Sequence, residues 1–330
     1  MLETRCCGLG NDKMNTLITG GFGYLGGRFA QHLQSSRERY RVRLGSRRER
    51  AAPPWCADAT TVLTTWELES SLEEACSGVD VVVHLSGMNA SECAADPVQA
   101  LEINGVATAR LLRAAIRTGV KRFVFVSTAH VYGSPLRGRI SEETNPSSLH
   151  PYASSHRAGG DVVRDAHARG QIEGVDVRLS NSFGAPTHAD TNCWMLVVND
   201  LCRQAALART MVLNTSADQR RDFITLTDAC RAIAHLASID REQLGDGLFN
   251  VGGEWAPTLK EIAERIGKSY ESTFGHPVSL SCKAPQSDST AKFELDYRID
   301  KLTRTGFTLE KNIDSEIADT LAFCAKRGVM

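Results

Sequence analysis

A glycine-rich segment, TGGFGYLGG, follows the apolar run at residues 15–19 and constrains this chain more than any other feature. Its glycines recur at every third position, and an amphipathic helical pattern comes after them. The first glycine permits a sharp turn, the second lets the backbone approach a pyrophosphate, and the third allows close packing of helix on sheet. Free N–H groups at the helix N-terminus would bind the anion, so this context predicts a dinucleotide-binding turn. The residues expected to contact the dinucleotide are Gly20, Gly23, Tyr24, Leu25 and Gly26.

Short β-rich runs alternate with helical patterns through the first half of the chain. Several of the runs are apolar nearly throughout, as parallel strands covered on both faces are. A helical spacing of apolar residues spans 98–117. The alternation predicts an α/β fold with a doubly wound parallel sheet of Rossmann type. The predicted strands are 15–19, 40–46, 60–65, 79–87, 121–128 and 175–181.

The regular alternation fades after residue 181, which suggests two domains. We expect a nucleotide-binding domain over 14–181. A smaller mixed α/β domain for the substrate is expected over 182–330, with some segments returning to the first domain. Residues 1–13 are expected to form a loose tail or to precede an alternative start at Met14.

Composition narrows the function classes. The formal net charge of −1 gives no electrostatic case for nucleic acid or an anionic membrane as the main partner. No stretch approaches the roughly 20 apolar residues that a membrane span requires. The ten cysteines include no CxxC pair, which matches neither a zinc site nor a disulfide framework, so no metal is expected. The first residues lack the apolar core of a signal peptide, and a cytoplasmic location with reduced thiols is the default.

The end of the second predicted strand, LGSRRER, bears on the choice of dinucleotide. An acidic side chain there would bind the ribose hydroxyls of NAD, but the sequence offers Ser46, Arg47 and Arg48. Guanidinium groups pair well with a 2′-phosphate, which favours NADP over NAD. The alternative is a solvated basic loop that contacts no cofactor.

Several motifs occur in an order that carries a family resemblance: TGGFGYLG, VVVHLSG, FVFVSTAHVYG, PYASSH, RDFITLTDACRAI and LFNVGG. With them, the chain resembles the extended short-chain dehydrogenase/reductases, and more closely their nucleotide-sugar epimerase, dehydratase and reductase branch. The resemblance runs from about residue 14 to the C-terminus. It implies a nicotinamide cofactor, a nucleotide-diphosphate sugar as substrate, and a homodimer formed through sheet-flanking helices.

The resemblance also implies roles for individual residues. Tyr152 matches the catalytic tyrosine, and Thr128 matches its partner, which also lies within reach of the substrate. Ser127 and the strand end from His84 to Gly87 would line the nicotinamide side, while Asn104 would hold the strand ends together. The positions thus expected at the cofactor are Leu85, Ser86, Gly87, Asn104 and Ser127. Asn181 and Arg221 match residues that contact the phosphates of the sugar nucleotide.

His156 is the main departure from the family pattern. A phenol with a pKa near 10 is poorly matched to proton transfer at neutral pH, and the family lowers this pKa with a lysine four residues after the tyrosine. An imidazole with its ordinary pKa near 6.5 would be only a part-time cation in that place. His156 is expected to bind the cofactor ribose or relay a proton, unless catalysis is weakened or lost.

A second departure concerns the residues after Thr128. The dehydratases carry two acidic residues there, whereas this chain has Ala129 and His130, so dehydration is disfavoured. His130 can act on the sugar as an acid or base, or it can be a packed strand-end histidine. Trp194 is either a wall of the substrate cleft or a core residue on a helix.

The function expected from the sequence is that of an NADP(H)-favouring oxidoreductase acting on a nucleotide-diphosphate sugar, most simply a 4-keto reductase. Two alternatives stay open. One is a 4-epimerase with tightly held NAD, and the other is a non-catalytic NADP-binding regulator, which the histidine at position 156 suggests.

Overall fold

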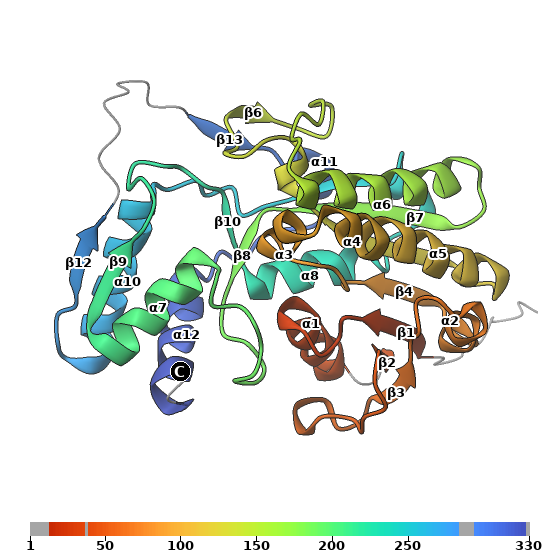
Figure 1. Ribbon diagram of the computed structural model, residues 1–330, viewed down its shortest axis with the longest axis horizontal. Helices are drawn as coiled ribbons and strands as arrows, with labels where there is room; N and C mark the ends of the chain where they lie inside the picture. Colours follow the sequence, from red (N-terminus) through yellow and green to blue (C-terminus); the bar gives the residue numbers. More distant parts are fainter. Residues whose placement is uncertain (1–12, 37–38, 284–293, 328–330) are drawn as a thin grey trace, which may run out of the picture.

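The computed structural model describes residues 13–36, 39–283 and 294–327 of the 330-residue chain. Seven parallel strands form the central sheet (Figure 1): β1 Met14–Thr19, β2 Tyr40–Ser46, β3 Thr60–Leu63, β4 Val81–His84, β5 Arg122–Thr128, β7 Glu173–Leu179 and β11 Leu248–Val251. Their order across the sheet is β3–β2–β1–β4–β5–β7–β11, so the winding reverses between β1 and β4. The predicted doubly wound α/β fold is confirmed.

The six predicted strands are present, with corrected ends. The strand predicted at 79–87 ends at His84, because the backbone of Leu85 to Gly87 leaves the sheet and faces the glycine-rich turn. The strand predicted at 60–65 ends at Leu63, because the N–H of Thr65 donates to the hydroxyl of Ser71 instead of to a strand. The strand predicted at 175–181 spans 173–179.

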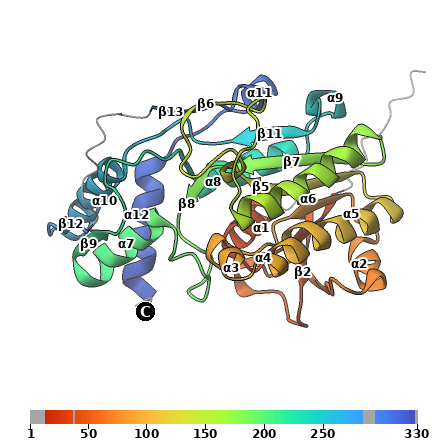
Figure 2. The same ribbon diagram turned by 45° about the horizontal axis from the view of Figure 1, so that its top comes forward.

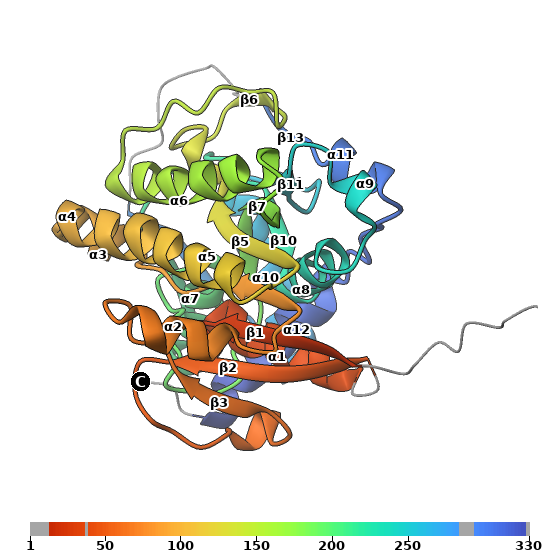
Figure 3. The ribbon, with the colours of Figure 1, turned by 90° about the vertical axis from the view of Figure 1, so that its right-hand side faces the viewer.

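Helices cover both faces of the sheet, as the apolar strands require. On one face, α1 Tyr24–Ser35 and α8 Leu226–Leu236 share a core with alternate residues of β1, β4, β5 and β7. On the other, α2 Glu69–Cys76, α5 Ala107–Arg117 and α6 Pro151–Ala168 form the second core. Figure 2 shows α5 and α6 side by side, and Figure 3 shows the two layers on opposite sides of the sheet.

The helix predicted at 98–117 is not uniform. It consists of α4 Pro97–Ala100, a π-helical turn η2 at Leu101–Val106, and α5. Segments of π-helix place an extra residue in the turn and are frequent at functional sites. Here the widened turn carries the buried Asn104.

The later part of the chain builds a second cluster, to the left of the sheet in Figure 1. Its core lies between α7 Val197–Ala208, α10 Leu259–Phe274 and α12 Ile313–Arg327. Three small parallel pairs lie beside the main sheet: β8 Asn181–Phe183 with β10 Phe223–Thr225, β9 Thr210–Leu213 with β12 Ser279–Cys282, and β6 Gly138–Ile140 with β13 Leu295–Tyr297. The remaining short helices are η1 Pro54–Cys56, α3 Ala90–Ala95, η3 Ala129–Val131, α9 Arg241–Leu244 and α11 Asp300–Arg304.

Two segments from beyond residue 182 belong to the main sheet and its helices, namely α8 and β11. The predicted tail at 1–13 lies outside the described residues, apart from Lys13. Of the helices that are described, none is both long and apolar enough to cross a membrane.

Candidate active site

A cleft of about 990 Å³ opens at the carboxyl ends of β1, β2 and β4, where doubly wound sheets bind their ligands. Three segments that are far apart in the sequence meet there: the glycine-rich turn, the end of β2 and the loop after β4. The predicted cofactor residues that line the cleft are Gly20, Gly23, Ser46, Arg47, Arg48, Leu85, Ser86 and Gly87.

Backbone crowding explains the glycines of the turn. Gly20 has φ +70°, and a Cβ atom there would lie 2.8 Å from the backbone of Leu85 and Ser86. A Cβ atom at Gly26 would lie 2.1 Å from the carbonyl oxygen of Gly20. No side chain fits at either position, and Gly23 precedes the first residue of α1. The turn therefore leaves room for a pyrophosphate at the N-terminus of α1.

The side chains of Tyr24 and Leu25 do not face this cleft. The Tyr24 hydroxyl donates to the carbonyl oxygen of Gly184 at 3.0 Å, and Leu25 packs against the apolar core. Only their backbone N–H groups, at the start of α1, remain for a contact with a phosphate, and that contact stays a prediction.

The arginines after β2 are exposed at the rim of the cleft. Arg47 and Arg48 line it, and the N–H of Arg48 donates to the hydroxyl of Ser46 at 3.2 Å. Arg50 lines it as well, with its guanidinium 4.4 Å from the ring centroid of Phe22. Arg50 was not among the residues that the sequence predicted at the cofactor.

Tyr152 and Thr128 come together from two elements. Tyr152 lies in the first turn of α6, and Thr128 is the buried last residue of β5. Burial raises the pKa of the Tyr152 hydroxyl above its ordinary value, and a hydrogen bond with the Thr128 side chain opposes this only in part. The phenol therefore keeps its proton at neutral pH.

His156 lies one turn further along α6, with its ring centroid 4.6 Å from that of Tyr152 and the two planes at 69°. Its residue is only 6% exposed, and this burial lowers the pKa of the imidazole to about 4. The expectation of a part-time cation is therefore wrong, because His156 is neutral at pH 7. Its Nε2 lies 3.6 Å from where a Cβ atom of Gly87 would be, so the ring borders the cleft wall.

The neutral state of His156 follows from a stack of rings beneath it. Phe125 stacks on His156 with centroids 5.8 Å apart, and His84 stacks on Phe125 at 5.6 Å. His84 is buried, with its ring nitrogens hydrogen-bonded to the hydroxyls of Thr19 and Thr108. The strand end was expected to line the nicotinamide side from His84 onward; His84 instead belongs to the core, because it ends β4 inside the sheet.

Asn104 joins the cleft to α6. Its Oδ1 accepts a hydrogen bond from the N–H of Met88 at 2.8 Å, and its Nδ2 donates to the hydroxyl of Ser155 at 3.0 Å. Ser155 in turn donates to the carbonyl oxygen of Tyr152. This buried side chain therefore connects the loop after β4 with the turn that carries the tyrosine.

Ser127 is held by residues that sequence reasoning missed. Its hydroxyl donates to Asp176 Oδ1 at 2.5 Å, and Asp176 Oδ2 lies 3.6 Å from Arg178 Nε. The Arg178 guanidinium lies 4.8 Å from the ring centroid of Tyr132. All four residues are buried. The signal was present in the strand VDVRL, where two charged residues interrupt an apolar run.

His130, Asn181 and Arg221 line a second, smaller pocket of about 220 Å³. No carboxylate is among its lining residues. Burial lowers the pKa of His130, the nearby Arg221 lowers it further, and its Nδ1 has no hydrogen-bond partner. Asn181 Nδ2 donates to the carbonyl oxygen of Asp222 at 2.9 Å. The pocket thus offers two guanidinium groups, from Arg220 and Arg221, together with amide side chains and a neutral imidazole.

Trp194 lines neither of these pockets. It lies in a turn before α7, not on a helix as one alternative had it, because the helix begins only at Val197. The ring is half-buried, and the guanidinium of Arg203 lies 5.6 Å from its centroid.

A family model described as "NAD dependent epimerase/dehydratase family" matches residues 16–252, which is well over half of the chain. The chain belongs to this family. The matched region includes every residue discussed above as a site residue. The resemblance stated from the motifs is therefore confirmed.

Curated members of the family are similar over most of their length. UDP-glucose 4-epimerase of Azospirillum brasilense is 26% identical over 263 residues, which cover 72% of this chain and 75% of the relative. A dTDP-glucose 4,6-dehydratase of an Actinoplanes species is 27% identical over 335 residues, which cover 94% of this chain and 97% of the relative.

Solved structures show the same fold. UDP-glucose 4-epimerase of Thermotoga maritima, solved with UDP-glucose, has a TM-score of 0.77 at 18% identity, covering 95% of this chain and 99% of that one. RMD of Pseudomonas aeruginosa, solved with NADPH, has a TM-score of 0.73 at 20% identity, covering 96% and 100%. The family thus indicates a nicotinamide cofactor. The glycine-rich turn, with its room for a pyrophosphate, fits such a cofactor.

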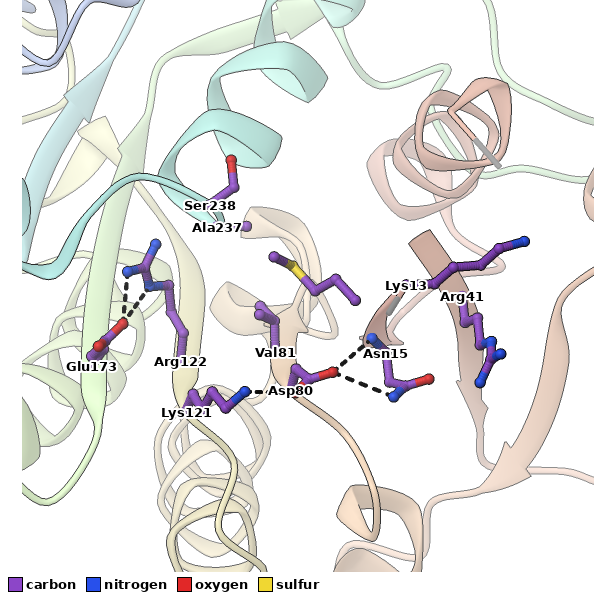
Figure 4. A pocket seen from close by; sticks show the side chains of 11 residues that line it. Lys13, Asn15, Arg41, Asp80, Val81, Lys121, Arg122, Glu173, Ala237 and Ser238 are labelled. Atoms are coloured by element: carbon purple, nitrogen blue, oxygen red, sulfur yellow. Dashed lines mark hydrogen bonds and ion pairs between the residues drawn. The ribbon is translucent and has the colours of Figure 1, made fainter. Parts of the chain in front are cut away.

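Another hollow, of about 590 Å³, lies at the opposite edge, at the amino ends of β1, β4, β5 and β7 (Figure 4). Its charged side chains largely neutralise one another: Lys121 pairs with Asp80 at 3.1 Å and Arg122 with Glu173 at 2.6 Å. Doubly wound sheets bind their ligands at the carboxyl ends of the strands, so this hollow is not the candidate site.

Proposed function

We propose that the chain is an NADP(H)-favouring oxidoreductase of nucleotide-diphosphate sugars, most simply a 4-keto reductase. The observation that carries the proposal is the protonation state of Tyr152. Burial raises the pKa of this phenol, and His156 beside it supplies no positive charge at neutral pH. An ordinary phenol is ionised to about one part in a thousand at pH 7, and Tyr152 is ionised less.

Reduction of a ketone needs a proton donor, whereas oxidation of an alcohol needs a base. The cofactor supplies the hydride when it is bound. Tyr152 then donates its hydroxyl proton to the carbonyl oxygen of the sugar, and Thr128 orients the phenol. His156 borders the cofactor cleft as a neutral hydrogen-bonding group. Tyr152 and His156 are therefore already in the protonation states that reduction of a ketone requires at neutral pH.

Two further observations favour reduction over the other reactions of the family. Arg47 and Arg48 stand at the end of β2, where a 2′-phosphate is read, and NADPH is the usual donor in synthesis. The segment after Thr128 holds Ala129 and His130 in place of carboxylates, which removes the acids that dehydration uses.

An assay of the purified protein separates this proposal from its rivals. The protein is first examined for bound nucleotide by absorbance and mass spectrometry, and is then mixed with NADPH and UDP- or dTDP-4-keto-6-deoxyglucose. One NADPH oxidised per sugar reduced is the expected result. Bound NAD with interconversion of C4 epimers identifies the epimerase that relatives suggest, and nucleotide binding without turnover identifies a regulator.

We also propose a homodimer through the helices that flank the sheet. Four apolar side chains are exposed on this face, carried by α4, η2 and α6: Val98, Leu101, Val106 and Val162. Light scattering on the purified protein is expected to give twice the chain mass, and Val106→Glu is expected to give the single mass. Leu207→Glu, at an exposed apolar position on α7, is the matched control. A monomeric wild-type protein contradicts the proposal.

A further inference from the structure

The segment after β8 runs along the helix that opens the cofactor site. We name residues 184–188 the bridging segment. The Tyr24 hydroxyl donates to the carbonyl oxygen of Gly184 at 3.0 Å, and Arg28 Nη1 donates to that of Ala185 at 2.8 Å. Both donors lie on the first turns of α1, so the segment is hydrogen-bonded to the helix that begins at the glycine-rich turn.

The other end of the bridging segment contacts the glycine-rich turn itself. A Cβ atom at Gly27 would lie 2.6 Å from Thr187 Oγ1, so the helix and the segment touch without space between them. His188 Nε2 lies 3.1 Å from the carbonyl oxygen of Phe22, to which it donates. The His188 ring also stacks on Trp55, with centroids 6.1 Å apart and planes at 9°.

A buried carboxylate fixes the crossing of these elements. Glu316, on α12, has a side chain only 4% exposed and pairs with Arg28 Nη2 at 3.0 Å. Its Oε2 accepts a hydrogen bond from the hydroxyl of Thr227, the second residue of α8, at 2.6 Å. A Cβ atom at Gly184 would lie 2.2 Å from Glu316 Oε1, so the carboxylate rests against the bridging segment.

A further helix, α7, also binds the bridging segment at Gly184. Asn199, fully buried on α7, accepts a hydrogen bond from the N–H of Gly184 at 3.2 Å and donates to its carbonyl oxygen at 2.9 Å. Asn181, which lines the smaller pocket, lies three residues before Gly184. The bridging segment thus connects the cofactor turn with Asn181, which is expected to contact the sugar nucleotide.

We infer that the bridging segment couples the cofactor site to the sugar-nucleotide site, with Arg28 and Glu316 as positioning residues. The inference rests on the proposed function for the identity of the second site. A cofactor that orders the turn at residues 20–27 orders residues 184–196 as well, because hydrogen bonds and close contacts join the turn and α1 to residues 184–188 at the start of that stretch. A ligand changes the order of a segment only if its contacts differ between the more ordered and the less ordered state. The change in order of residues 184–196 on cofactor binding can be measured.

Hydrogen–deuterium exchange on the whole protein measures the effect of cofactor binding on these residues. The cofactor is NADP⁺ or NAD⁺, whichever binds in a fluorescence titration. In the wild type, the cofactor is expected to slow amide exchange both in 20–27 and in 184–196. In Glu316→Gln, which keeps the shape and removes the charge, protection of 20–27 remains and the slowing in 184–196 is lost. Asp314→Asn is the matched control, because Asp314 lies on α12 like Glu316 and also pairs with an arginine, Arg265 of α10, but its side chain is 70% exposed.

Arg28→Lys is the second variant, in case Glu316→Gln does not fold. It keeps the charge and loses the planar fork that reaches Ala185, Thr227 and Glu316 together. If Arg28 had a purely structural role, Arg28→Lys would lower the melting temperature but would leave the effect of the cofactor on amide exchange unchanged. The inference is overturned if the wild type shows no slowing in 184–196, or if a folded variant retains it in full.

A titration with UDP or dTDP separates this inference from the proposed function. In the wild type, bound cofactor is expected to tighten the diphosphate by at least about fivefold, the lower end of common coupling factors. Glu316→Gln loses this gain. If neither diphosphate binds while the exchange coupling is present, the substrate class is wrong and the coupling stands.

Discussion

The imidazole of His156 meets the phenol of Tyr152 edge-on, with ring centroids 4.6 Å apart, and neither ring carries a charge at neutral pH. In both cases burial is the main cause, and it disfavours the charged form of each group. The pair is thus suited to give a proton to a substrate oxygen. It is poorly suited to remove one, which sets the direction of the predictions below.

Tyr152→Phe removes only the hydroxyl and keeps the ring packing against His156. We expect turnover to fall by roughly 10²–10⁴-fold, the usual effect of losing a positioned acid. Cofactor affinity and melting temperature should stay near the wild-type values. Thr128→Val is expected to reduce turnover less, because it removes the group that orients the proton donor. If Tyr152→Phe retains most activity, another group carries the proton, and His130 is the first to test.

Arg47→Ala combined with Arg48→Ala should weaken NADPH binding and leave NADH binding nearly unchanged. Each charge-assisted contact with a phosphate contributes roughly 1.5–3 kcal/mol, so the loss should be at least about tenfold. Fluorescence titration with both cofactors measures it. Arg304→Ala, at an exposed position on α11, is the control. Equal weakening of both cofactors would show that these arginines do not read the 2′-phosphate.

Much of the sheet was predictable because several of its parallel strands, such as β4 and most of β5, are apolar along nearly their whole length. The glycine-rich turn was predictable because one of its steric limits lies within the motif itself, where a Cβ atom at Gly26 would meet the carbonyl oxygen of Gly20. Strand ends were less predictable: Leu85 follows directly on the apolar run of β4, yet the strand ends at His84, and Leu85 and Ser86 lie against Gly20.

The electrostatics of the site could not be read from the sequence. The low pKa of His156 on α6 comes from its burial, to which the stacked ring of Phe125 on strand β5 contributes. Likewise, nothing near Arg28 in the sequence indicates Glu316, which lies on the last helix. Such pairs are fixed by packing between distant elements. Local patterns do not contain that information.

The buried pair beneath the active site gives a stability prediction. Asp176→Asn leaves the Arg178 guanidinium buried without its carboxylate, and breaking such a pair costs about 3–5 kcal/mol. Asp165→Asn removes the partner of Arg169 in an exposed pair on α6 and should cost under about 1 kcal/mol. Urea unfolding measures both. Similar losses for the two variants would show that the buried pair is not specially stabilising.

Stability should also depend on pH through His156. The pKa of the imidazole is about 4 in the fold, against about 6.5 in the unfolded chain. Between about pH 4 and pH 6.5 the imidazole binds a proton in the unfolded chain but not in the folded protein. The contribution of His156 to the free energy of unfolding is therefore complete above about pH 6.5 and is lost as the pH falls. At pH 5 the loss is about 2 kcal/mol. Between pH 7 and pH 5, the free energy of unfolding measured in urea should fall less in His156→Gln than in the wild type. The difference between the two proteins should be about 2 kcal/mol. The exposed His276→Gln is the control, and a slope equal to the wild type in His156→Gln contradicts the prediction.

His156→Lys restores the cation that the family normally places beside the tyrosine. A lysine there lowers the pKa of Tyr152 and raises the fraction of phenolate at neutral pH. Oxidation of the alcohol uses the phenolate, so its kcat/KM at pH 7 should rise by up to about tenfold for each unit that the tyrosine pKa falls. Reduction uses the phenol, so it should change much less, or slow at high pH.

The pH profile separates this electrostatic effect from a change in shape. The gain in oxidation should vanish above the pKa of the wild-type tyrosine, where the phenolate is already formed without help. His156→Gln, which is neutral like the native imidazole, should show no gain at any pH. Both directions are measured as kcat/KM across pH with the same sugar pair. If lysine leaves the oxidation profile unmoved or abolishes cofactor binding, then position 156 does not tune the tyrosine, and the protonated state of Tyr152 follows from its own burial alone.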